Sequence, residues 1–510
     1  MSFEVTAMTD RIDVLVVGAG PAGLALACDL QRRGVRLRVI DAADHSFEGS
    51  RAKGIQPRTQ EVLDDLGILA EIQSHSSLYP LLGAHVGPLT VPWMMIRHRK
   101  PTEDVPHPNT LLVAQHDTDA AIKRRLEQLG GTVEYRTRLS SYEQHADGVV
   151  ATVEGPAGIV RISARFLVGA DGGGSTVRRT AGIDFIGDTD ESDRMIVADV
   201  TLTGLPRNRW HIWPRSNGRF MALCPLPDGN KFQLMLKLCP DEKADLGQEA
   251  VNRLVQEFTG SKLHVAQVHW ASVWRPNIRL AQRYRSGNVF LVGDAAHVHP
   301  PTGGQGLNTG VQDAYNLGWK LGQVLAGAPD DLLDTYEAER QPIAARVLGL
   351  SSDIYARMSS RPLAAAKRGD EERQLALNYR GGPLAADSGE ESRNVVAGDR
   401  APNARYLDTN GRPAQLFDTF RGAHFTLIAA GEPAVSALKH ISWPSTGAAL
   451  KTVEVPEKDA AGVRRIYGIT NPAQILVRPD GYVAYVAQDD WTGALSKCSE
   501  LMLPPTRRDT

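Results

Sequence analysis

The hydrophobic pattern near the N-terminus predicts a strand, a tight turn, a helix and a second strand. Residues 12–17 form an apolar, β-branched run, which is typical of a buried parallel strand. Apolar side chains then recur at helical spacing over residues 24–30, and Gly34 can cap the end of this helix. Residues 35–40 alternate as a second strand that ends on Asp41. This order predicts the start of a Rossmann-like α/β domain.

The turn between this strand and helix reads GAGPAG, and its three glycines have separate physical roles. Gly18 allows the tight turn, Gly20 lets the backbone approach a pyrophosphate, and Gly23 lets the helix pack closely on the strand. The helix N-terminus offers free N–H groups to the phosphates, and Asp41 can accept the ribose hydroxyl protons. The pattern predicts a dinucleotide site, with a turn that binds nothing as the alternative, and does not decide between FAD and NAD(P). The predicted binding residues here are Gly18, Gly20, Pro21, Ala22, Gly23, Asp41 and Ala42.

Two more apolar strands run into turns that contain glycine and aspartate. The first, in RFLVGADGGGSTVRR, leads to Asp171, and Ser175 is a good N-cap for the helix that follows. The second, in NVFLVGDAAH, leads to Gly293 and Asp294. It continues through PPTGGQGLNTG into a helix that we expect to begin near Leu307, with one apolar stripe along its length.

The middle of the chain alternates between apolar and polar residues, as strands do. Residues 186–279 predict an antiparallel sheet, joined by a strand near residues 81–97. The alternation places Trp210 and Trp213 on opposite faces of this sheet. Ordinary sheet core is the alternative for every large side chain here. The candidates for an apolar substrate pocket are Trp93, Met94, Trp210, Trp213, Met221, Met235 and Trp274.

The C-terminal third reads as a linker and a separate unit. Residues 359–398 are polar and rich in Gly, Arg and Asp, which predicts a linker with short helices. Residues 399–510 form a new unit. In it the stretch ILVRPDGYVAYVAQ predicts a hairpin that turns at residues 479–481. The unit resembles a thioredoxin-like domain. It lacks the CxxC motif after its strand FTLIAAG, so we expect no thiol redox activity.

Composition excludes several classes of protein. A net charge of −2 over 510 residues gives no reason to expect nucleic acid or an anionic membrane as a partner. Four widely spaced cysteines, no signal peptide and no long apolar run predict a cytoplasmic protein that does not cross a membrane. His297 and His299 have no third ligand nearby, so we expect no metal site, and His297 is expected to pack and form hydrogen bonds.

The three glycine motifs, in this order, resemble the FAD fingerprints of the group A, single-component aromatic hydroxylases with the p-hydroxybenzoate hydroxylase fold. The resemblance covers most of the chain and is closest to phenol hydroxylases and polyketide or rifamycin hydroxylases with a thioredoxin-like C-terminal domain. It implies an FAD-binding domain in two parts, residues 1–185 and 280–358, around a substrate-binding sheet at 186–279. The linker at 359–398 and the thioredoxin-like domain at 399–510 follow.

The resemblance also implies roles for individual residues. Arg51 would reach the pyrophosphate and flavin region, Gln115 would lie near the ribityl chain, and Asp171 would support FAD. The alternatives are a surface arginine, a loop amide and a helix cap, respectively. Asp119 stands where the family often has glutamate. The expected FAD contacts further along the chain are Gly293, Asp294 for the ribityl phosphate, Pro301, Gly304, and the backbone of Gly306, Leu307 and Asn308 at the pyrimidine edge, with Pro300 and Pro301 as the wall above the ring.

The implied activity is that of an FAD-dependent aromatic monooxygenase. FAD would bind tightly without a covalent bond, NADPH or NADH would reduce it, and O2 would form a flavin C4a-hydroperoxide that hydroxylates a phenolic or polycyclic aromatic substrate. No side-chain nucleophile is expected. The alternatives are Baeyer–Villiger insertion or oxidative rearrangement of a polycyclic ketone, a halogenase, and a non-catalytic flavin-binding protein. We expect a monomer or a homodimer.

Overall fold

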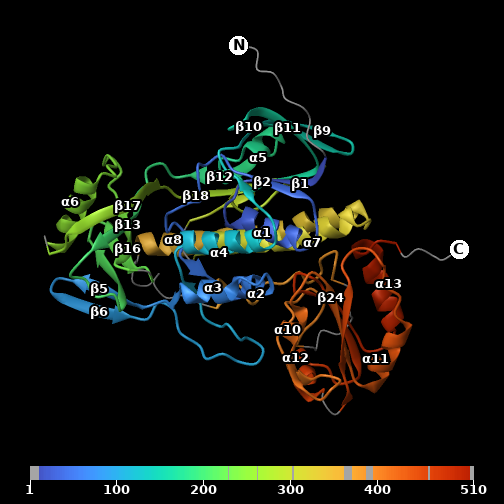
Figure 1. Cartoon of the computed structure of the whole chain (residues 1–510). Coiled ribbons are helices and arrows are strands. Elements are labelled where there is room, and N and C mark those ends of the chain that lie inside the picture. The colour runs from blue at the N-terminus through green and yellow to red at the C-terminus, as the bar shows by residue number, and fades with distance from the viewer. Residues whose placement is uncertain are drawn as a thin grey trace.

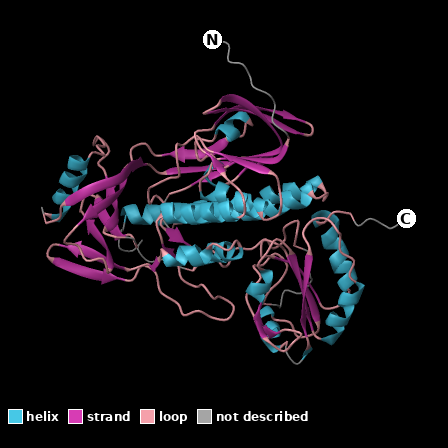
Figure 2. Cartoon of the chain, viewed as in Figure 1, coloured by secondary structure: helices cyan, strands magenta, loops and turns pink. Residues whose placement is uncertain are grey.

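The computed structural model describes residues 11–227, 229–260, 262–300, 304–360, 370–385, 394–457 and 460–505. Two sheet-rich regions lie at opposite ends of a layer of long helices, and a third sheet lies above those helices (Figures 1 and 2). The predicted mixed α/β fold with several sheets is therefore confirmed.

The first sheet has a parallel centre, in the order β20-β11-β1-β2-β8, with an antiparallel extension. Its central strand β1 is the predicted apolar run, and its last four residues are buried because both faces of the strand are covered. Strands β10 and β9 continue the sheet as a meander next to β11. The strands are β1 (Ile12–Val17), β2 (Leu37–Ile40), β8 (Val133–Glu134), β9 (Arg138–His145), β10 (Gly148–Gly155), β11 (Gly158–Gly169), β19 (Arg285–Ser286) and β20 (Val289–Leu291).

Helix α7 runs through the centre of the molecule. It begins at Gly306, one residue before the predicted start, and is buried from Asn308 to Leu321 on every side. Its polar residues are buried along with its apolar ones, and must therefore find partners inside the protein. The bounds of α7 are Gly306–Leu325. The other helices of this part are α1 (Pro21–Gln31), α2 (Pro57–Asp65), α3 (Leu69–Ser74), α4 (Gln115–Gln128), α5 (Thr176–Thr180) and α8 (Asp334–Ser360), with 3-10 turns η1 (Gly293–Ala295) and η2 (Asp330–Leu333).

The second sheet is the predicted, mostly antiparallel one, in the order β17-β13-β16-β15-β14-β5-β6. Two strands from the region near residues 81–97 join it, and the first of them pairs in parallel with β14. Helix α6 (Gln248–Thr259) covers one face, so the other face is free to form a cavity wall. The strands are β5 (Leu81–Val86), β6 (Leu89–Trp93), β13 (Met195–Leu202), β14 (Arg209–Pro214), β15 (Phe220–Pro225), β16 (Lys231–Lys237) and β17 (Val265–Trp274).

The C-terminal unit contains a four-stranded mixed sheet in the order β25-β24-β26-β27. The predicted hairpin is β26 and β27, and Gly481 allows its turn because its φ is +75°. Its elements are β22 (Arg405–Leu407), β23 (Pro413–Gln415), β24 (Phe425–Ala430), β25 (Leu450–Val455), β26 (Ala473–Val477), β27 (Val483–Ala487), α10 (Leu416–Phe420), α11 (Glu432–Ala437), α12 (Ala461–Tyr467), α13 (Trp491–Met502) and the 3-10 turn η4 (Leu438–His440).

Short strands connect these parts. They form two small sheets, in the orders β12-β18-β21 and β3-β7-β4. In the predicted linker, α8 extends to Ser360 and a 3-10 turn, η3 (Glu371–Arg373), follows, while residues 361–369 and 386–393 lie outside the described residues. The connecting strands are β3 (Gly54–Ile55), β4 (Ser77–Leu78), β7 (Leu111–Leu112), β12 (Phe185–Thr189), β18 (Asn277–Ala281) and β21 (His297–Val298).

Candidate active site

A single cavity of about 1300 Å³ lies between the first sheet, the start of α7 and the free face of the second sheet. Sites for one small molecule usually measure about 300–1,000 Å³. The cavity therefore has room for a large cofactor together with a second molecule. Its walls come from the glycine turn before α1, segment 51–56, the turn at Gly293, and strands β14, β15, β16 and β17.

The glycine turn before α1 has the geometry that a diphosphate requires. Gly18 has a φ of +108°, and a Cβ there would lie 2.3 Å from the carbonyl oxygen of Ala170. A Cβ on Gly23 would lie 2.0 Å from the carbonyl oxygen of Gly18, so both glycines are needed for packing. A Cβ on Gly20 would meet nothing within 4 Å, because this residue faces the cavity. Pro21 and Ala22 also line it, so the start of α1 is open to a phosphate group.

The end of β2 lies beside this turn rather than on the cavity wall. The Asp41 carboxylate accepts hydrogen bonds from the N–H groups of Ala19, at 2.7 Å, and Ala43, at 2.8 Å. These bonds fix the carboxylate against the glycine turn. Asp41 and Ala42 are both outside the cavity lining, so their contact with the ribose stays a prediction.

Arg51 and Gln115, from separate parts of the chain, both line the cavity. Gln115 begins α4, and its Oε1 accepts a hydrogen bond from the N–H of Ala52 at 3.2 Å. Its Nε2 donates to Oδ2 of Asp119 at 3.2 Å. Burial raises the pKa of Asp119 to about 7, although the hydrogen bond from Gln115 acts in the opposite direction.

Asp171 caps a helix. Its carboxylate accepts hydrogen bonds from Oγ of Ser175 and from the N–H groups of Thr176, at 2.7 Å, and Val177, at 3.1 Å. The sequence analysis gave a helix cap as the alternative role of Asp171. Its neighbours Ala170 and Gly172 line the cavity but Asp171 does not, so its support of FAD stays a prediction.

The start of α7 faces the cavity. The predicted residues Gly293, Asp294, Gly304, Gly306 and Leu307 all line it. The first N–H groups of a helix have no acceptor within the helix, so this end favours negative charge in the cavity.

Asn308 does not line the cavity, so the contact of its backbone with the pyrimidine edge stays a prediction. Its buried side chain accepts a hydrogen bond from the N–H of Gln56, at 2.8 Å, and donates to the carbonyl of Gly54, at 2.8 Å, so it fastens segment 54–56 to the helix start. Pro300 is buried but does not line the cavity, and Pro301 lies outside the described residues.

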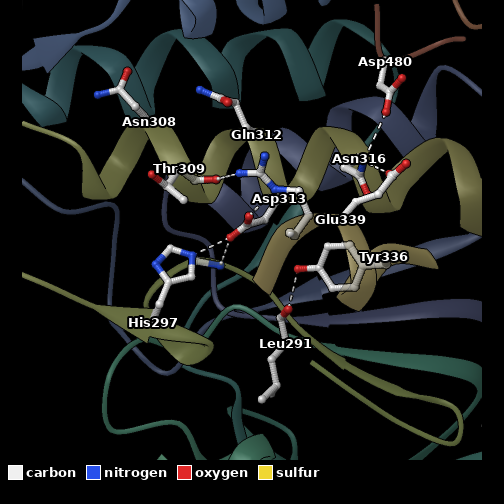
Figure 3. A network of polar contacts seen from close by, with 12 residues as sticks. Leu291, His297, Asn308, Thr309, Gln312, Asp313, Asn316, Tyr336, Glu339 and Asp480 are labelled. Carbon is white, nitrogen blue, oxygen red and sulfur yellow. Dashed lines mark hydrogen bonds and ion pairs between the residues drawn. The ribbon is translucent and has the colours of Figure 1, made fainter. Parts of the chain in front are cut away.

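The two histidines of the motif differ in their surroundings. His297 is buried, and its Nε2 lies 2.7 Å from Oδ2 of Asp313, whose Oδ1 accepts a hydrogen bond from Nε of Arg340 at 2.8 Å (Figure 3). This is the packing and hydrogen-bonding role that the sequence predicts. His299 lines the cavity, and burial lowers its pKa to about 4, so it is neutral near pH 7. In the ranges that the structure describes, no three metal-binding side chains come together.

The second sheet separates the seven predicted pocket residues into two groups. Met94, Trp210, Met235 and Trp274 line the cavity, whereas Trp93, Trp213 and Met221 do not. Trp210 and Trp213 are on opposite faces, as the alternation predicts. Trp213 stacks on His85 with 4.3 Å between ring centroids, and Met221 is in the core beneath α6. Trp93 is exposed on the edge strand β6.

Several cavity residues were missed from the sequence. Phe220 and Ala222 line the cavity on the face of β15 opposite Met221, and Trp270 lines it from β17. Lys53 and Gln233 also line it. The strand alternation could have identified Phe220 once the face was known. Lys53 stands two residues after Arg51 in a polar stretch and looks like a solvated residue, so no pattern identified it.

Comparison with known proteins agrees with this geometry. Residues 11–351 match the model of an FAD binding domain, and residues 394–503 match the model of an aromatic-ring hydroxylase C-terminal domain. The chain belongs to the FAD-dependent aromatic-ring hydroxylases. The predicted family, fold and FAD-dependent monooxygenase activity are thereby confirmed.

Three relatives illustrate this membership. A flavin-dependent monooxygenase of Mycobacteroides abscessus is 40% identical over 489 residues, covering 94% of this chain and 98% of the relative. The solved anhydrotetracycline hydroxylase OxyS of Streptomyces rimosus is 32% identical with a TM-score of 0.76, covering 97% of this chain and all of the other. A ternary complex of aklavinone-11 hydroxylase with FAD and aklavinone is 28% identical with a TM-score of 0.79 and equal coverage.

The residues of this hydroxylase fit FAD. Gly20 gives open space at the start of α1, while Arg51, Gln115 and Asp294 are distributed along the cavity between α1 and the start of α7. Residues from both ends of the predicted cofactor site thus line one continuous cavity. None of the helices in the described ranges is long and apolar enough to cross a membrane.

Proposed function

We propose that this hydroxylase uses NADPH or NADH and O2 to hydroxylate a phenolic or polycyclic, polyketide-like aromatic substrate. The observation that supports this most directly is the single cavity, which extends from the glycine turn at Gly20 to the aromatic wall of Trp210 and Trp274. Cofactor and substrate can therefore lie in one space. Anhydrotetracycline and aklavinone, named with the two solved relatives, are polycyclic aromatic compounds, which supports the substrate class.

In this proposal FAD, when bound, supplies the redox chemistry that activates O2. The chain's own residues bind and orient. The start of α7 stabilises negative charge on the cofactor through its free N–H groups. The apolar side chains of Trp210, Met235 and Trp274 hold the aromatic ring and exclude water, which limits wasteful release of hydrogen peroxide.

Anaerobic stopped-flow absorbance tests the proposal. The FAD-loaded protein is mixed with NADPH or NADH, with and without a panel of phenols, naphthols and polycyclic hydroxyquinones. We expect at least one compound to accelerate loss of the flavin band by about tenfold or more, and to gain one hydroxyl group when O2 is admitted. A flavin that neither nicotinamide reduces with any compound would contradict the proposal. A lactone as product would contradict the hydroxylation step alone.

The cellular location and the assembly belong to the same proposal. Four cysteines, three of them buried and all free, suit a reducing cytoplasm. We propose a monomer or a homodimer, which size-exclusion chromatography with light scattering distinguishes.

A further inference from the structure

The backbone of Lys53 is fixed where the cofactor side and the substrate side of the cavity meet. Its carbonyl accepts hydrogen bonds from Oη of Tyr79, at 3.0 Å, and from the N–H of Val113, at 3.2 Å. The next residue, Gly54, accepts the bond from Asn308 at the start of α7. Lys53 is therefore held in a constant position relative to the helix end that faces the cofactor.

The side chain of Lys53 extends from there to the substrate sheet. Its Nζ donates a hydrogen bond to Oε1 of Gln233, lies 3.7 Å from Sδ of Met235, and lies 4.6 Å from the ring centroid of Trp210. All four residues line the cavity. Within the described ranges Lys53 forms no ion pair, whereas Arg99 and Arg275 on the same cavity pair with exposed carboxylates.

Asp199, an acidic residue of β13 in this sheet, already has its own donors. Asp199 accepts hydrogen bonds from the N–H of Ser50, at 2.8 Å, and from Oγ of Ser50. The Nε2 of Gln233 donates to Oγ of Ser50 at 2.8 Å and to the Ser50 carbonyl, which turns Oε1 of Gln233 towards Lys53. Burial lowers the pKa of Lys53, and the neighbouring Cys224 and Asp199 offset this effect only in part. An ammonium has three donors, so Lys53 can still bind an anion from the cavity.

We propose that Lys53 binds an anionic oxygen of the substrate, the ionised hydroxyl of a phenol or enol. It thereby selects acidic aromatic compounds and positions their ring over Trp210. The inference rests on the proposed function, because the ring that Lys53 holds is the one to be hydroxylated. An ionised hydroxyl also makes that ring richer in electrons, and the cavity gives the anion a direct cationic partner in a region of low dielectric.

Equilibrium dialysis of the oxidised, FAD-loaded protein tests this inference with two probes. One is 2-hydroxy-1,4-naphthoquinone, which is an anion at neutral pH, and the other is its neutral ether, 2-methoxy-1,4-naphthoquinone. We expect the wild type to bind the anion about tenfold or more tightly than the ether, since hydrogen bonds to charged groups have this strength. Lys53→Met should abolish the preference, and Lys53→Arg should keep part of it.

Lys497→Met is the matched control, because it removes an exposed lysine on α13 and should leave the preference unchanged. The flavin spectrum of each variant shows that FAD is still bound, and the affinity for the ether reports any general damage to the cavity. Equal preference in wild type and Lys53→Met, or a wild type without preference for the anion, would overturn the inference. The dialysis experiment contains no nicotinamide and does not depend on flavin reduction. If the flavin is not reduced in the stopped-flow experiment, the proposed function is contradicted, but the binding preference measured by dialysis still stands.

Discussion

Two lysines of this protein, Lys53 and Lys320, have their pKa values lowered by burial, but they have opposite surroundings. The Lys320 ammonium lies 2.7 Å from Oε2 of Glu339, and burial lowers its pKa to about 8 despite that carboxylate. Lys53 has no ion pair among the described residues and faces the cavity. The first charge is satisfied within the protein, and the second is left for a ligand.

Lys320 belongs to a larger network of buried ion pairs and hydrogen bonds. Glu339 of α8 also accepts from both terminal guanidinium nitrogens of Arg478, which lies between β26 and its turn. Asp480 in that turn accepts a hydrogen bond from Nδ2 of Asn316, at 3.2 Å (Figure 3). It also accepts one from Nε1 of Trp319, at 3.1 Å. A buried ionic network thus links the C-terminal hairpin to α7, the helix whose other end lines the cavity. Paired buried charges mark a junction between parts of the protein, and an unpaired one marks a binding surface.

Breaking the paired network should have the largest effect. Glu339→Ala leaves Lys320 and Arg478 buried without this carboxylate. We expect the free energy of unfolding to fall by about 3–5 kcal/mol, as it does when one partner of a buried ion pair is removed. Urea unfolding followed by circular dichroism measures it. Glu249→Ala is the control, because its side chain is 93% exposed and its ion pair is 4.0 Å long, so a change below about 0.5 kcal/mol is expected. Equal losses in the two variants would show that the network does not stabilise the junction.

Asp119 is a buried carboxyl that has no ion pair among the described residues, and the effect of changing it should be intermediate. Burial raises the pKa of Asp119 to about 7 in the folded protein, while the unfolded chain keeps a value near 3.8. The folded state therefore binds the proton more strongly, and its stability falls as the pH rises from about 4 to about 7. We expect Asp119→Asn to gain about 2 kcal/mol over the wild type between pH 5 and pH 8. Unfolding measured at both pH values checks this, with exposed Asp241→Asn as the control. A pH-independent difference would contradict it.

The smallest effect on stability should come from Lys53 itself. Lys53→Met removes a charge without leaving a carboxylate unpaired, so we expect the free energy of unfolding to change by less than about 0.5–1 kcal/mol. The same urea experiment measures it on the FAD-loaded protein. A loss as large as that of Glu339→Ala would mean that Lys53 also stabilises the fold, and would remove the distinction between the two lysines.

The sequence predicted much of the fold because the relevant signals are local. Glycine turns, apolar strand runs and the hairpin at Gly481 depend on neighbouring residues, and each formed where expected. Trp213 and Met221 were wrongly grouped with the cavity residues, because alternation separates the two faces of a strand without saying which face a helix covers. Lys53 was missed because its role depends on Gln233, 180 positions away in the chain. Long-range pairing of this kind leaves no periodic signal.

The position of α7 has a consequence for the order in which the protein folds during synthesis. The ribosome produces α1 early, yet α1 packs on α7, and Gly310 of α7 lies directly against Ala22 and Gly293. Strand β20, which flanks β11, also comes late. The first half of the chain thus emerges with its apolar surface uncovered until the whole substrate sheet has been translated. Uncovered apolar surface favours aggregation of a nascent chain, and the cavity can close only after the whole of α7, up to residue 325, has left the ribosome.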